Sequence, residues 1–83
     1  MQSKAKISYD ARTFQQIWES LGKDERHELS SRIYQNKCAG APSTIWFWGN
    51  GKKAPASPLI RETVSKVVGS FLNIKTHPKI LFP

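Results

Sequence analysis

Apolar side chains recur at three- and four-residue steps near the start of the chain, which is the spacing of one helix face. Thr13 and Gln16 fit the pattern of a capping box, which marks a helix start. Gly22, with the basic Lys23 beside it, is typical of a helix end. The apolar positions between these signals are Phe14, Ile17, Trp18 and Leu21.

The clearest helical pattern follows residue 57. Ser57 suits the N-cap position, and Pro58 suits the first position of a helix. A continuous apolar stripe follows, made of Ile60, Val64, Val67, Val68 and Phe71. The positions expected to face outward on this helix are Arg61, Glu62, Ser65 and Lys66.

Two weaker helices are predicted between these. Asp24 is the expected cap of one, which carries Leu29 and Ile33 one turn apart and ends near residues 39–40. The other covers about residues 43–48 and ends at a Gly-Asn-Gly turn, residues 49–51. The final "KTHPKILFP" is either a packed arm or a disordered tail, because a short apolar run lies between its prolines.

These patterns predict one all-α domain, a helix-turn-helix bundle of four or five short helices. The length of 83 residues fits a single small core. We expect a flexible arm over residues 1–9, a helical core over 10–72, and a C-terminal arm or tail over 73–83.

Charge is unevenly distributed along the chain. Residues 1–28 hold five basic and five acidic groups, whereas residues 29–83 hold eight basic groups and one acid, Glu62. The net charge of +7 therefore comes from the second part. Such a field favours a polyanionic partner, although a solvated basic surface is equally compatible with it.

The stretch "STIWFWGNGKKAP", residues 43–55, resembles the third helix of the phage-repressor (Cro and XRE-like) helix-turn-helix family. The resemblance covers about residues 40–70 and implies a lambda-repressor-like fold. Upstream, Tyr34 and Gln35 stand where the family has a Leu-Ala pair, so no contact is carried over to the second helix. The matching positions are Ser43, Thr44, Ile45, Trp48, Asn50, Gly51, Lys52 and Pro55.

The helical phase divides this stretch into two faces. Ile45 and Trp48 share one face and should pack on the first and fourth predicted helices, whereas Ser43, Trp46 and Phe47 share another. Trp46 and Phe47 face DNA, face a protein partner, or pack against the C-terminal segment. By the resemblance and these phases, the predicted DNA-binding residues are Pro42, Ser43, Thr44, Trp46, Phe47, Asn50, Lys52 and Lys53.

Several kinds of chemistry are not expected. Cys38 is the single cysteine, predicted to be a small core residue, and His27 and His77 are far apart in sequence, so no zinc finger is predicted. Neither a glycine-rich phosphate loop before a helix nor a Ser-His-Asp spacing is present, so we expect no catalytic residues, small-molecule substrate, metal or cofactor. Without a long apolar run or a signal-peptide h-region, a cytoplasmic protein with no membrane partner is expected.

The function predicted from the sequence is sequence-specific binding of double-stranded DNA. The resemblance implies transcriptional control in a bacterial or phage cell, with a homodimer on paired half-sites as a possible assembly. The alternative is a protein–protein interaction module on the same fold, with Trp46 and Phe47 as exposed anchors.

Overall fold

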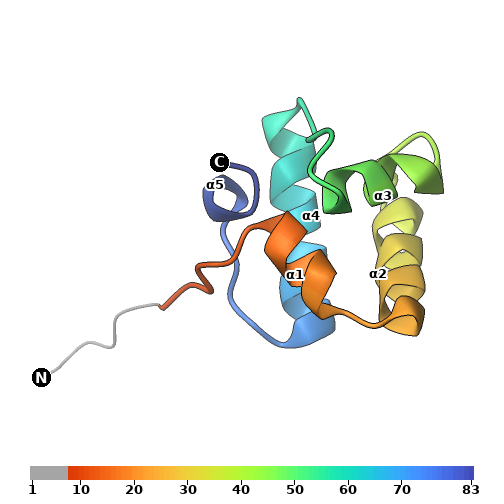
Figure 1. Cartoon of the computed structure of the whole chain (residues 1–83). Helices are drawn as coiled ribbons and strands as arrows, with labels where there is room; N and C mark the ends of the chain where they lie inside the picture. The colour runs from red at the N-terminus through yellow and green to blue at the C-terminus, as the bar shows by residue number, and fades with distance from the viewer. Residues whose placement is uncertain (1–7) are drawn as a thin grey trace, which may run out of the picture.

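The computed structural model describes residues 8–83, and the helices of this part form one small bundle (Figure 1). The predicted all-α bundle of four or five short helices is confirmed. Residues 1–7, most of the arm that we expected to be flexible, lie outside the described residues. The helices are α1 (Phe14–Ser20), α2 (Lys23–Gln35), α3 (Pro42–Gly49), α4 (Pro58–Leu72) and α5 (Pro78–Leu81).

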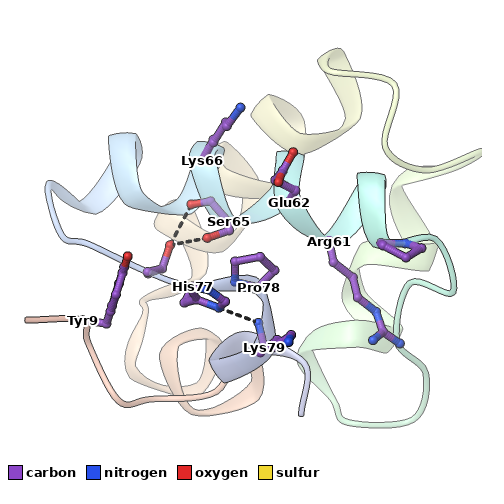
Figure 2. A pocket seen from close by; sticks show the side chains of 10 residues that line it. Tyr9, Arg61, Glu62, Ser65, Lys66, His77, Pro78 and Lys79 are labelled. Atoms are coloured by element: carbon purple, nitrogen blue, oxygen red, sulfur yellow. Dashed lines mark hydrogen bonds between the residues drawn. The ribbon is translucent and has the colours of Figure 1, made fainter. Parts of the chain in front are cut away.

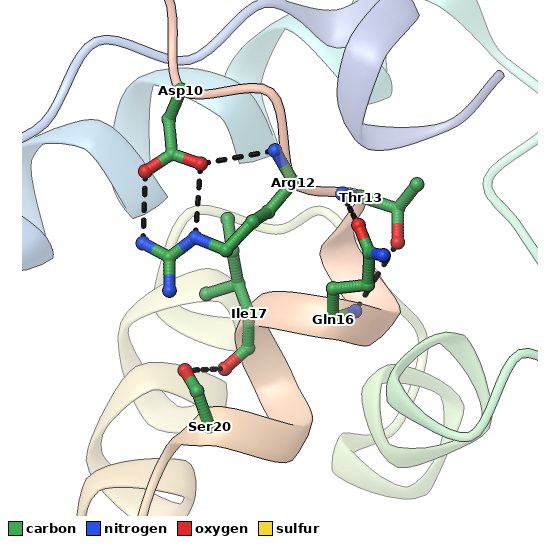
Figure 3. Close-up of polar contacts among 6 residues, drawn as sticks. All are labelled: Asp10, Arg12, Thr13, Gln16, Ile17 and Ser20. Carbon is green, nitrogen blue, oxygen red and sulfur yellow. Dashed lines mark hydrogen bonds and ion pairs between the residues drawn. The ribbon is translucent and has the colours of Figure 1, made fainter.

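Side-chain caps start α1 and α4, as their local sequences predict. The Gln16 amide N–H donates to Thr13 Oγ1 at 3.2 Å, and the Thr13 N–H donates to Gln16 Oε1 at 2.9 Å (Figure 3). At α4, Ser57 Oγ accepts from the Ile60 N–H at 3.4 Å, and Pro58 is the first helical residue. These contacts satisfy amide groups that have no partner inside the helix.

The junction between α1 and α2 differs from the prediction. Gly22 does not end α1 in a left-handed conformation; its φ is −73° and its ψ is 170°. It is instead the N-cap of α2, and its N–H donates to Glu25 Oε1 at 2.9 Å. Asp24 is therefore not the cap, and only Leu21 and Gly22, both with extended backbone, separate the two helices.

The core lies where α1, α2, α3, α4 and the C-terminal segment meet, and α2 contributes Leu29 and Ile33, which are both 0% exposed. Trp48 is 5% exposed, and its ring packs edge-on against Phe14 of α1 at a centroid distance of 6.5 Å. A second aromatic neighbour is Phe82, from the C-terminal segment. The sequence predicted that α3 packs on the first and fourth helices; α1 is confirmed as a partner, but α2, not α4, is the second main one. The predicted core residues Ile60, Val67 and Phe71 are only partly buried against this cluster.

The C-terminal segment is a packed arm, which answers the question that the sequence left open. Leu81 and Phe82 are buried, and the Phe82 ring stacks on Phe14 at 5.4 Å. The chain before α1 runs beside this arm, because the Asp10 N–H donates to the Lys75 carbonyl at 2.7 Å. Figure 1 shows α5 on one side of α4, with α2 and α3 on the other.

The predicted outward position of Ser65 on α4 is wrong. Ser65 is 5% exposed because the segment after α4 turns back and covers it. The Thr76 hydroxyl donates to the Ser65 carbonyl at 2.7 Å, and the two hydroxyl oxygens lie 2.9 Å apart. The reversal uses Asn73 in the left-handed region, at φ 56°, and a close approach of Ile74 to Gly69.

Candidate nucleic-acid interface

Helix α3 has one buried and one exposed face, in the phase that the sequence predicts except at Trp46, which was expected on the exposed face and is half-buried against the core. Ile45 and Trp48 point into the core, and Gly49 is also buried. The helix begins after Ala41, which is extended at φ −155°, with Pro42 in the first turn. Pro42, Ser43 and Phe47 are exposed, and Thr44 is half-buried.

Trp46 is half-buried, and its neighbours come from α1 and α2. Its ring meets the Trp18 ring at 84° and a centroid distance of 4.9 Å. On the α2 side, the His27 ring centroid is 5.2 Å away. Trp46 therefore helps to fix α3 against the preceding helices and leaves only part of its ring at the surface.

Phe47, in contrast, is 39% exposed. Its ring has a cationic neighbour in Lys53, whose Nζ atom lies 5.6 Å from the Phe47 ring centroid. A cation over an aromatic face is attracted by the negative charge of that face. The pair therefore groups an apolar surface and a positive charge beside the end of α3.

The end of α3 turns sharply and leaves its lysines in solvent. Gly51 adopts φ 76°, as expected for a glycine that ends a helix, and its N–H donates to the Trp48 carbonyl at 3.2 Å. The Lys52 N–H then donates to the Phe47 carbonyl at 3.0 Å. We call the exposed residues of this region the α3 surface: Pro42, Ser43, Phe47, Asn50, Lys52 and Lys53.

The loop after the α3 surface is held by a residue that the sequence did not single out for this role. Arg61, expected to face outward, is half-buried, and its Nε atom donates to the Pro55 carbonyl at 2.6 Å. Pro55 itself is buried. No local pattern links the two positions, because the contact depends on how the loop folds over the start of α4.

The connection between α2 and α3 is longer than the three to four residues common in helix-turn-helix motifs. Helix α2 ends at Gln35, before the predicted end near residues 39–40, and the turn covers residues 36–41. Lys37 has a positive φ of 60°, which stops α2 early. Cys38, in this turn, is buried as predicted, and desolvation raises the pKa of its thiol.

The basic side chains do not gather on one face. Lys52 and Lys53 lie at the α3 surface, but Arg32 pairs with Glu28 at 3.0 Å. Lys66 and Lys79 line a cavity between α4 and α5. The α3 surface therefore holds only part of the excess positive charge that the sequence assigns to residues 29–83.

Within residues 8–83, no group of histidine, cysteine and acidic side chains is arranged to hold a metal ion. In the same part of the chain, no helix combines the length and the apolar character needed to cross a bilayer.

Comparisons with known proteins find no matching family model, no similar curated protein and no similar solved structure. The likeness to phage repressors therefore rests on the residues of the α3 region alone.

Proposed function

We propose that the protein binds double-stranded DNA, with α3 in the major groove and the loop after it on the phosphate backbone. The observation that supports this most is the pairing of exposed Phe47 with Lys53 at the end of an exposed helix face. The major groove of DNA is wide enough to admit a helix. Lysines at the end of such a helix reach phosphates, which fix its position without reading sequence.

Each exposed side chain has a contact that suits its chemistry. The Ser43 hydroxyl can bond to a base edge, and the Phe47 ring can touch a thymine methyl group. Asn50 can bond to a phosphate, and Lys52 and Lys53 neutralise phosphate charge. Half-buried Trp46 offers its remaining edge to the sugar and backbone. Few of these groups can form bidentate hydrogen bonds with a base. Contacts with the phosphate backbone therefore contribute more to the binding free energy than contacts with base edges.

This function fits transcriptional control in the cytoplasm of a bacterial or phage-infected cell. A homodimer would bind only DNA sites whose two half-sites have the matching spacing. This requirement would supply the sequence preference that one copy lacks. The proposal includes no catalytic step.

The test compares two double variants that change the net charge equally. Lys52→Ala/Lys53→Ala should weaken binding to all duplex sequences and lower the slope of log K against log salt by about 1.8 units, the value for two lost phosphate contacts. Lys66→Ala/Lys79→Ala removes two charges that lie outside the α3 surface. The salt slope of this variant should stay close to that of the unmodified protein. Fluorescence anisotropy with a labelled random duplex measures both. Equal slopes for the two variants would contradict the proposal.

A second candidate function is a protein-interaction module, favoured by the 39% exposure of Phe47 on a helix with few charges. Large aromatic side chains often carry much of the binding energy at protein interfaces. Such binding depends little on salt, whereas duplex binding falls steeply with it. The salt series therefore also separates the two functions.

A further inference from the structure

A second surface, separate from the α3 surface, lies between α4 and α5. It is an open cavity of about 580 Å³, with walls from α4, from the start of α5 and from the chain before α1. Figure 2 shows Tyr9 at one end, Lys66 on the α4 rim, Lys79 on the α5 rim, and His77 with Pro78 between them. No residue of the α3 surface lines it.

Positive charge dominates the rim of this cavity. Arg61, Lys66 and Lys79 line it together with one acid, Glu62. A smaller adjoining hollow is lined by Lys75, and both hollows share Tyr9 and Lys66. The two hollows therefore form one groove, in which three lysines, Lys66, Lys75 and Lys79, stand against one acid, while the Arg61 guanidinium is engaged with the Pro55 carbonyl.

The aromatic ring of Tyr9 lines both hollows of this groove. Tyr9 is 44% exposed and meets the His77 ring edge-on, at 83° and a centroid distance of 5.3 Å. Its backbone is fixed by the next residue, because the Asp10 N–H donates to the Lys75 carbonyl at 2.7 Å. The exposed ring is thus held against His77, in a cavity that Lys66 and Lys79 also line.

We propose that this groove binds single-stranded nucleic acid, with Tyr9 as a stacking platform and the lysines on the phosphates. Basic grooves that contain exposed aromatic rings bind single strands, because every base offers a flat face for stacking. A duplex hides those faces inside its own stack, and an acidic peptide has none. The combination of ring and charges therefore favours a single strand over either alternative. This inference goes beyond duplex binding at the α3 surface and does not depend on it.

The experiment measures binding of labelled oligo(dT) by fluorescence anisotropy to the full chain and to three variants. Tyr9→Phe keeps the ring and should bind like the original protein. Tyr9→Leu keeps an apolar side chain without the ring and should weaken binding about fivefold or more, the effect of losing one stacked base. Lys66→Ala/Lys79→Ala should lower the salt slope by about 1.4 units, the single-strand value for two phosphates. Thermal unfolding checks that each variant is folded.

Three results would overturn the inference. One is oligo(dT) affinity that Tyr9→Leu leaves unchanged. Another is displacement of oligo(dT) by a polyglutamate peptide of equal charge at equal concentration, which would assign the groove to acidic proteins. The third is a loss of oligo(dT) binding in Lys52→Ala/Lys53→Ala as large as in Lys66→Ala/Lys79→Ala, which would assign the single strand to the α3 surface. The two double variants are expected to affect different ligands. A failure of single-strand binding would therefore not affect the test of duplex binding at the α3 surface.

Discussion

The Nε atom of Arg61 donates a 2.6 Å hydrogen bond to the Pro55 carbonyl, and this contact ties α4 to the loop that carries Lys52 and Lys53. Hydrogen bonds to charged groups are among the stronger ones in proteins. Lys52 and Lys53 therefore lie in a loop whose C-terminal end, at Pro55, is fixed to α4.

Arg61→Gln should destabilise the protein by about 1–2 kcal/mol, because the Pro55 carbonyl loses a charged donor. It should also weaken duplex binding more than the loss of one charge explains, since the loop loses its anchor. Lys66→Gln, which removes one exposed charge from the same helix, is the control. Urea unfolding and duplex anisotropy measure the two effects. Equal changes in both variants would show that Arg61 does not position the loop.

The backbone of Gly49 lies directly against the Trp18 ring. A Cβ atom at residue 49 would lie 2.4–2.6 Å from three atoms of that ring, which is closer than real contacts allow. Gly49→Ala should therefore cost about 1–3 kcal/mol of stability, as overpacking of a core does. Gly40→Ala, where a Cβ would meet nothing within 4 Å, is the control and should be nearly neutral. Urea unfolding that gave both variants the stability of the original protein would contradict the packing of α3 on α1.

Asp10 and Arg12 form an ion pair at 2.8 Å (Figure 3). Hydrogen bonds from the Arg12 side chain and backbone lower the pKa of Asp10 from 3.8 to about 2. A carboxyl whose pKa is lower in the folded state stabilises the fold above its unfolded pKa, and that stability is lost as the pH falls from about 4 toward 2. The pair is partly exposed, so its contribution is small and weakens with salt.

Asp10→Asn should therefore be slightly less stable than the original protein at pH 6 and equally stable near pH 2. Glu62→Gln, which removes an acid but keeps the Asp10–Arg12 pair, should retain the loss of stability between pH 4 and 2 that this pair produces. Urea midpoints at low salt across this range measure both. A stability difference between Asp10→Asn and the original protein that grew as the pH fell would contradict a lowered Asp10 pKa.

Phe47→Ala tests the exposed aromatic of the α3 surface. Because Phe47 is exposed and does not belong to the core cluster or to the side chains packed against it, its loss should change stability little. Discrimination for a preferred site with an A·T pair should fall by about 1 kcal/mol, while binding to random duplex stays nearly unchanged because no charge is lost. Trp48→Ala is the contrast, and should cost about 3–5 kcal/mol of stability from the core. Unchanged site preference with an altered monomer–dimer equilibrium would assign Phe47 to a protein interface.

Local signals predicted the helix starts well. The caps at Thr13 and Ser57 depend on residues within one turn, so the sequence contains all that they need. A glycine alone gives less information, because its φ depends on the path of the neighbouring residues. Gly22 therefore starts α2 although its position suggested the end of α1.

Long-range contacts account for the features that the sequence did not reveal. Ser65 is polar and was expected in solvent, but the arm after α4 covers it through Thr76, eleven residues away. The hydrogen bond from Arg61 to Pro55 was not predicted for the same reason, because it depends on how the loop folds over the start of α4. At the α3 surface, the helical phase correctly separated buried Trp48 from exposed Phe47. It could not predict that Trp18 and His27 would cover part of Trp46, since that depends on where α1 and α2 lie.

Duplex binding by the α3 surface is tested most directly by titrating the isotope-labelled protein with random duplex DNA at low salt and following the backbone amide shifts. We expect saturable shifts within residues 42–53, reversed by added salt, with residues 76–79 of the α4–α5 groove unaffected. Unchanged amide shifts for residues 42–53 at saturating duplex would contradict duplex binding at this surface, whether or not the amide shifts of other residues change.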